Sequence, residues 1–305
     1  MTLDIGDWTF IFRAGVWKPR TSPQTFQGVG EPALAWLQEV KERFGVEVAT
    51  EVATPEHVEA ALQAGIDYLW IGARSSANPI AVQSICSAIL DLRFKIFDLK
   101  GIFIKNPVNA DAALWLGNIE RLEKTGVPVM AVHRGCNHQP CWSMAHQVRL
   151  ARPDIPMLLD PSHMSGDAAK VPALIEKISE LGLDGAMVEI HAHPESALSD
   201  RKQQIRPDEI GEWKLEIEDF KDTELNWLRA EIDELDERLW DTIAARMDVS
   251  KRIGAWKKEH GVTPLQPERY KQIVERLRVN GYGLSEEFML RIWEIIHEES
   301  LKQQK

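Results

Sequence analysis

The chain has 305 residues, of which 44% are hydrophobic and 27% charged, and its formal net charge is -11 at pH 7. This length favours two domains, or one barrel with an appendage. The negative charge argues against nucleic acid or an acidic membrane as the main partner. We find no apolar stretch of membrane-spanning length and no charged-then-apolar leader. The three cysteines do not form a disulfide framework, so we expect a cytoplasmic enzyme.

Short apolar runs alternate with helical patterns from residue 9 to about residue 195. The runs lie at residues 10–16, 47–52, 68–71, 102–104, 129–132, 157–159 and 186–190. Helical stretches between them include residues 32–44, 55–64 and 168–181. Repeated strand-helix units predict a parallel sheet, and their number favours a barrel over an open sheet. With seven strands, the α/β fold expected is a TIM barrel of the (β/α)8 type that is one strand short.

The rest of the chain has a different pattern. We interpret the polar residues 206–222 as a linker between a barrel domain at 1–205 and a helical domain at 223–305. Apolar residues recur at helical spacing from Leu228 through Leu235 and Leu239, which predicts one long helix to about residue 259. Two shorter helices are predicted at 267–280 and 285–304. Three such helices cannot cover their own apolar faces, so we expect a homodimer.

Basic side chains recur at the carboxyl ends of the predicted strands, where barrel enzymes place their active sites. They are Arg13, Lys18, Arg20, Arg74, Lys105 and Arg134. Several interrupt apolar runs, where a bare charge is costly unless an anion meets it. A salt bridge at the rim is the alternative for any single one. As a set they indicate small substrates that carry phosphate or carboxylate.

Three further polar residues lie in or after the last two predicted strands: Glu189 in the run at 186–190, His163 after the run at 157–159, and Asp200. One imidazole and two carboxylates suit a divalent metal ion of the manganese, iron or zinc type. The alternative is that the histidine is a hydrogen-bonded structural residue. We expect the three to bind Mn²⁺ or a similar ion.

Six segments of this region, in order, resemble the class I β-type 3-deoxy-7-phosphoheptulonate (DAHP) synthases. They are IFRAGVWKPRTSPQTFQGVGE, WIGARSSANP, IKNPVN, HRG, DPSH and VEIHAHPESALSD. That family condenses phosphoenolpyruvate with erythrose 4-phosphate in a (β/α)8 barrel that uses a divalent metal ion. The resemblance implies that phosphoenolpyruvate is bound by Arg13, Lys18, Arg74, Lys105 and Arg134. It also implies that Arg20 and Thr21 bind erythrose 4-phosphate, and that the metal ligands are His163, Glu189 and Asp200.

One motif of that family has no counterpart in this sequence. The family's first strand carries Gly-Pro-Cys-Ser, whose cysteine is the fourth metal ligand, whereas Cys136 and Cys141 follow the HRG segment. We therefore expect a barrel that lacks its first strand and a synthase activity that is impaired.

A second set of cations lies on the predicted helices. Arg246 continues the apolar stripe of the long helix, and a charge on such a stripe must be paired or must meet a ligand. Lys257 is about 20° away from it at about 100° per residue, so the two cations face one pocket. Arg229 is roughly 100° off that face, which suits a pocket in a partner chain. A surface helix with snorkelling basic residues is the alternative.

Three segments of this half resemble the AroQ-type, all-helical chorismate mutases: LRAEIDELDERLWDTIAARMDVSKRIGAWKKEHG, LQPERYKQIVERL and FMLRIWEIIHEESLKQQ. That family forms an intertwined dimer. The resemblance implies a three-helix domain whose catalytic residues are Arg229 of one chain and Arg246, Lys257, Arg269, Ser300 and Gln304 of the other. Tyr270 stands where some members carry glutamate. The implied rearrangement of chorismate to prephenate needs no cofactor.

Together the resemblances imply a bifunctional enzyme of the shikimate pathway. Two alternatives stay open. In one, the barrel keeps full synthase activity because water or another residue replaces the missing ligand. In the other, the chain is a monofunctional mutase whose non-catalytic barrel is an allosteric or assembly module.

Overall fold

The computed structural model describes residues 10–20, 22–92, 98–210 and 223–304. The chain divides into two compact units, Met1–Glu231 and Ile232–Lys305. The boundary falls within helix α10 (Thr223–Glu259), so the first turns of this helix belong to the first unit. The domain limits at residues 205 and 223 stay predictions.

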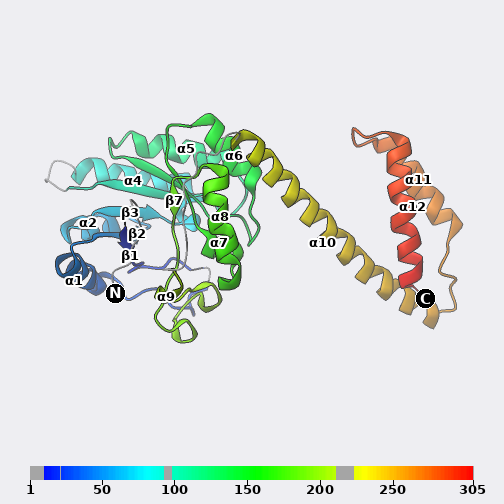
Figure 1. Ribbon diagram of the computed structural model, residues 1–305, viewed down its shortest axis with the longest axis horizontal. Coiled ribbons are helices and arrows are strands. Elements are labelled where there is room, and N and C mark those ends of the chain that lie inside the picture. The colour runs from blue at the N-terminus through cyan, green and yellow to red at the C-terminus, as the bar shows by residue number, and fades with distance from the viewer. Residues whose placement is uncertain (1–9, 21, 93–97, 211–222, 305) are drawn as a thin grey trace. The chain divides into compact units, whose positions relative to one another are not determined.

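The first unit contains a parallel sheet of seven strands over the described residues, coloured blue to green in Figure 1. In chain order, the strands are β1 (Ile11–Arg13), β2 (Glu47–Val52), β3 (Tyr68–Ile71), β4 (Gly101–Lys105), β5 (Val129–His133), β6 (Met157–Leu159) and β7 (Gly185–Ala186). Each pairs with the next in sequence. The predicted α/β fold is therefore confirmed.

Two strands are shorter than the sequence predicts. β1 ends at Arg13 rather than residue 16, because the amide of Val16 donates to the side-chain hydroxyl oxygen of Thr50 instead of to the backbone of β2. β7 ends at Ala186 rather than residue 190, and beyond it Ile190 forms an isolated bridge with Ile205.

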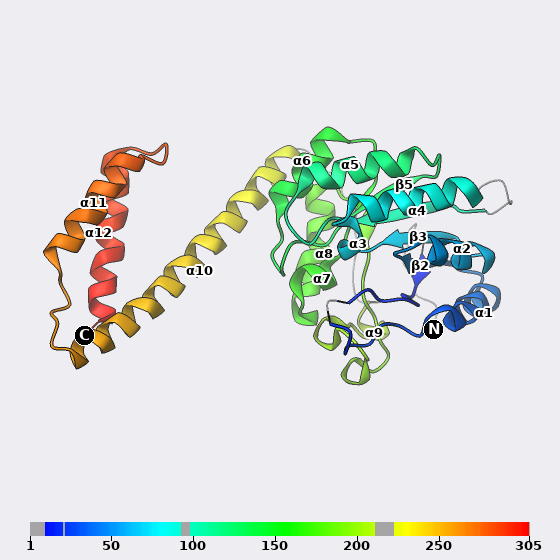
Figure 2. The same ribbon diagram turned by 180° about the vertical axis from the view of Figure 1, so that it is seen from behind.

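Helices follow the strands of this sheet. They are α1 (Leu34–Phe44), α2 (Pro55–Gln63), α3 (Ala73–Ser76), α4 (Pro79–Leu92), α5 (Ala112–Glu123), α6 (Trp142–Ala151), α7 (Pro161–Ser165), α8 (Val171–Leu181) and α9 (Pro207–Ile210). Each of them except α9 lies in a crossover connection between two strands. Figure 2 shows α2, α4 and α5 outside the strands, where α4 packs against both of its neighbours.

Alternate residues of each strand enter two different cores. Leu69 and Ile71 of β3 face the core beneath the helices, whereas Trp70 packs with Phe103 of β4 and Val132 of β5 on the opposite face. This follows from the two-residue period of a strand, and it explains why the strands are nearly continuous apolar runs. Both faces of the sheet are thus covered.

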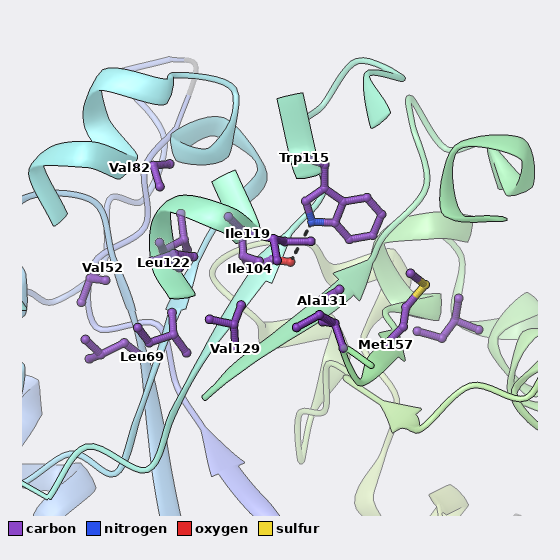
Figure 3. Close-up of a cluster of buried hydrophobic side chains, with 14 of the residues drawn as sticks. Val52, Leu69, Val82, Ile104, Trp115, Ile119, Leu122, Val129, Ala131 and Met157 are labelled. Carbon is purple, nitrogen blue, oxygen red and sulfur yellow. Dashed lines mark hydrogen bonds between the residues drawn. The ribbon is translucent and has the colours of Figure 1, made fainter. Parts of the chain in front are cut away.

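Figure 3 shows the core on the helix side. Trp115 of α5 is completely buried there, and its indole Nε1 donates to the carbonyl oxygen of Ile104 at 3.3 Å. A buried indole N–H needs such a partner, so this bond fixes α5 against β4 as well as filling the core.

The second unit is helical, as predicted. It contains the rest of α10, together with α11 (Pro267–Asn280) and α12 (Glu286–Gln303). α10 and α12 approach closely at Gly254, where an added Cβ would lie 2.6 Å from Gln304 Cα. Leu235 and Leu239 of α10 are 57% and 52% exposed, so this unit leaves a large apolar surface uncovered. No described helix is long and apolar enough to cross a bilayer.

Candidate active sites

A cavity of about 340 Å³ lies at the carboxyl ends of the strands. Its lining includes all six basic residues that the sequence singled out: Arg13, Lys18, Arg20, Arg74, Lys105 and Arg134. Arg13 and Lys105 end their strands, and the others follow strand ends, so the parallel register brings them to one rim. Thr21 lies outside the described residues.

One ion pair at this rim is buried. Lys105 Nζ lies 2.6 Å from Asp160 Oδ2, and the two side chains are 6% and 0% exposed. His163 Nδ1 lies 2.9 Å from the same carboxylate oxygen. Burial alone would raise the pKa of Asp160, but the charges of His163 and Lys105 hold it well below its ordinary value. Asp160 is therefore ionised and orients both neighbours.

The three expected metal ligands come together beside this pair. His163, Glu189 and Asp200 each offer one ligand atom, and these atoms all lie within 4.8 Å of one another. Because Asp160 engages His163 at Nδ1, Nε2 faces Glu189 at 3.6 Å, the arrangement that supporting carboxylates impose on metal-binding histidines. The donor set and its spacing fit a divalent metal ion.

The carboxylates of this trio also pair with cations expected to bind substrate. Lys18 Nζ lies 2.6 Å from Asp200 Oδ2, and Arg20 lies 3.2 Å from it. Burial opposes ionisation, but Lys18 and Arg20 hold the pKa of Asp200 below its usual range. Arg13 lies 3.5 Å from Glu189. An anion or a metal ion that binds here would therefore compete with these ion pairs, because the charged groups already have partners.

Two guanidinium groups, those of Arg74 and Arg134, lie close enough to repel each other. Burial lowers the pKa of Arg134, and the positive charge of Arg74 adds to this effect, whereas the nearby Asp160 carboxylate opposes it. The backbone N–H of Arg134 donates to Asn106 Oδ1 at 2.7 Å, and Asn106 is fully buried. A polyanion between the two arginines would relieve the repulsion, so this corner suits a phosphate group.

Three lining or supporting residues have no role in the sequence-based site: Glu51, Asn106 and Asp160. Burial raises the pKa of Glu51, although Lys105, Arg13 and Lys18 partly offset it. Gly72 makes room for this carboxylate, since a Cβ there would lie 2.0 Å from Glu51 Oε1. For Glu51, the sequence signal that could have been used is a carboxylate inside the predicted strand at residues 47–52.

The helical unit brings together four of the six residues expected in its site. Arg246 donates to the Ser300 hydroxyl, and Lys257 Nζ donates to Gln304 Oε1 at 3.0 Å and to the Pro264 carbonyl oxygen at 2.6 Å. Arg269 is exposed on α11. Arg229 belongs to the first unit, is exposed, and contacts Asn226 at 3.5 Å.

Two residues that the sequence did not single out, Trp293 and His297, lie beside Arg246. Its guanidinium lies over the Trp293 ring, 5.2 Å from the centroid. Trp293 in turn packs against His297 and Tyr270. The pattern that could have found them is the spacing of residues 293, 297, 300 and 304, which puts all four on one helix face.

Comparison with known proteins identifies the families. Residues 4–225 match the DAHP synthetase I family. The chain belongs to this family. Residues 228–305 match chorismate mutase type II. Both resemblances drawn from the sequence are confirmed, and both families are families of enzymes.

Individual relatives agree with this assignment. Phospho-2-dehydro-3-deoxyheptonate aldolase of Thermotoga maritima is 30% identical over 203 residues, covering 64% of this chain and 56% of the relative. 2-Dehydro-3-deoxyphosphooctonate aldolase of Helicobacter pylori is 27% identical over 221 residues, 66% of this chain and 79% of the relative. In the helical part, 4-amino-4-deoxychorismate mutase of Streptomyces venezuelae is 39% identical over 75 residues, 24% of this chain and 73% of the relative.

Solved structures support the fold of this DAHP synthetase I family member. The crystal structure of the Thermotoga maritima DAHP synthase has a TM-score of 0.57 at 28% identity, covering 67% of this chain and 58% of that chain. A truncated form of the Thermotoga maritima synthase, at 24% identity and a TM-score of 0.54, covers 67% and 72% and shares the fold. The chain thus spans somewhat more than half the length of the full-length Thermotoga maritima proteins.

Proposed function

We propose that this chain is a bifunctional, cytoplasmic enzyme of the shikimate pathway. Its helical unit would rearrange chorismate to prephenate, and its sheet unit would condense phosphoenolpyruvate with erythrose 4-phosphate. The matches to both families and the two clusters of cations support this proposal.

The observation that carries the mutase half is the set of neutral partners around its cations. Arg246 contacts a hydroxyl group, and Lys257 contacts an amide and a carbonyl oxygen. A dicarboxylate can bind there without first displacing an acidic side chain. The rearrangement needs no acid or base, so catalysis consists of holding a compact conformer and stabilising charge on the breaking ether bond. Lys257 and Gln304, which are hydrogen-bonded to each other, would do the latter.

The substrate's second carboxylate needs a further cation. We propose that it comes from Arg229 of a partner chain, with Arg269 completing the site, in a homodimer formed through the mutase helices. The exposed apolar side chains of α10 support this, since Leu235 and Leu239 are more than half exposed.

The synthase half rests on the cavity at the strand ends. Arg74 and Arg134 would hold the phosphate of phosphoenolpyruvate, with Arg13, Lys18 and Lys105 around the rest of that substrate. Arg20 and Thr21 would hold the phosphate of erythrose 4-phosphate. Mn²⁺ or a similar ion on His163, Glu189 and Asp200 would polarise the aldehyde. The protein's own contribution is to fix two polyanions at a short distance.

Two assays test the proposal on the same preparation. The mutase half requires that the protein consume chorismate and form prephenate. The synthase half requires phosphate release from phosphoenolpyruvate that depends on both erythrose 4-phosphate and Mn²⁺ and that EDTA stops. Mutase activity without any such release would refute the synthase half and favour the non-catalytic barrel.

A further inference from the structure

Three rings form a cluster beside Arg246 in the helical unit. Tyr270 of α11 lies 4.9 Å from His297 of α12, measured between ring centroids, and Trp293 lies 5.6 Å from His297. His297 precedes Ser300 by one turn of α12, on the face that carries Gln304. The cluster therefore adjoins the groups proposed to bind the substrate.

Two polar atoms of this cluster are buried without a partner among the described residues. They are Nε1 of Trp293 and Nε2 of His297. A buried polar group without a hydrogen bond is costly, and such groups are rare in folded proteins. Their place beside Arg246 indicates that a polar ligand atom meets at least one of them.

Burial and the nearby positive charges disfavour protonation of the His297 ring. Burial lowers the pKa of His297, and the positive charges of Arg246 and Lys257 on α10 lower it further, against a small opposing effect of Glu298 on its own helix. Tyr270 faces it from α11. A neutral imidazole exchanges a hydrogen bond readily with a hydroxyl group. An ammonium group there would be repelled by both cations.

We propose that His297 determines specificity by hydrogen-bonding the hydroxyl group on the ring of the substrate, and that the site thereby prefers a 4-hydroxy over a 4-amino substrate. The inference rests on the proposed mutase function, and it assigns the side chain that recognises the substituent on the substrate's ring. It also distinguishes this chain from the Streptomyces venezuelae relative, whose name specifies a 4-amino substrate.

The test compares kcat/KM for chorismate and for 4-amino-4-deoxychorismate in the wild type, His297→Leu and His297→Asn. We expect the wild type to prefer chorismate. His297→Leu should lower kcat/KM for chorismate about tenfold, the cost of one lost hydrogen bond, with little effect on the amino substrate. His297→Asn should restore part of the preference. His260→Leu, an exposed histidine stacked on Trp256, is the matched control and should change neither value.

Each other outcome overturns the inference. An equal loss on both substrates would assign His297 a structural role, and a change in oligomeric state would assign it to assembly. If the ratio of kcat/KM for the two substrates is the same in His297→Leu as in the wild type, His297 does not recognise the substituent. A wild type that turns over neither substrate would refute the mutase proposal itself, together with this inference.

Discussion

The two clusters of cations differ in what neutralises them. At the strand ends, Arg13, Lys18 and Lys105 each pair with a carboxylate, and the pair of Lys105 is buried. In the helical unit, Arg246 and Lys257 contact neutral groups of the described residues. The first cluster therefore holds the fold together as well as lining a cavity. The second cluster is the one proposed to bind a ligand, and removing one of its members should harm binding more than folding.

The largest effect is expected from Arg246→Ala. Losing the guanidinium proposed to bind a carboxylate should lower kcat/KM for chorismate by about 10³-fold or more, because its charge acts in a partly buried site. The free energy of unfolding should change little. Lys251→Ala is the control, since Lys251 is 59% exposed on the same helix. Unchanged chorismate turnover would contradict the assignment of the site.

Lys105→Met tests whether a cation at the strand ends stabilises the fold of the sheet unit. It leaves the buried carboxylate of Asp160 without its closest cation, so the free energy of unfolding should fall by about 3 kcal/mol in urea titrations. Lys271→Ala breaks an ion pair with Glu268 whose members are 72% and 82% exposed, and should cost less than about 1 kcal/mol. Equal costs for the two variants would remove the distinction between the clusters.

His163→Ala probes the metal site by itself. The variant should bind Mn²⁺ about 100-fold more weakly by calorimetry, because one of the three proposed ligands is lost and its supporting bond to Asp160 with it. His193→Ala is the control, since His193 is 74% exposed. Chorismate turnover should be unaffected in both variants. Wild-type affinity in His163→Ala would place the metal elsewhere.

The smallest expected effect comes from Leu239→Arg. This variant tests whether the helical unit depends on dimer assembly as well as on its cations. A cation on the exposed apolar stripe should weaken the proposed homodimer about tenfold or more in sedimentation experiments, and mutase activity should fall with it at low protein concentration. Glu237→Arg, on the opposite side of α10, is the control. If the dimer is unaffected, the stripe does not form the interface.

Much of the architecture could be predicted from the sequence. The bounds of β2, β3, β6, α10 and α11 agree with the predicted ranges, because each element is an uninterrupted periodic pattern between clear breaks. β1 and β7 were predicted too long. Their ends depend on where a neighbouring backbone or side chain accepts a hydrogen bond, as Thr50 does from Val16.

The candidate sites were predictable only in part. The basic residues interrupt apolar runs, which made all six at the strand ends recognisable. Glu51 and Asp160 were missed as members of the site, because their importance depends on which cations the fold places beside them. His297 was missed for a related reason: it shares a helix face with residues 293, 300 and 304, but that face indicates a site only once the neighbours of the histidine are known.

By itself, the sequence determined the order of strands and helices, the change from α/β to all-helical structure, and the families to which the two parts are related. These properties follow from local periodicity and from motifs made of residues that are adjacent in the sequence. Only the tertiary structure decided which charges neutralise one another and which polar atoms are left for a ligand. Those outcomes depend on distances between residues far apart in sequence, such as Lys105 and Asp160 or Arg246 and Ser300, and on how much water the packing excludes around them.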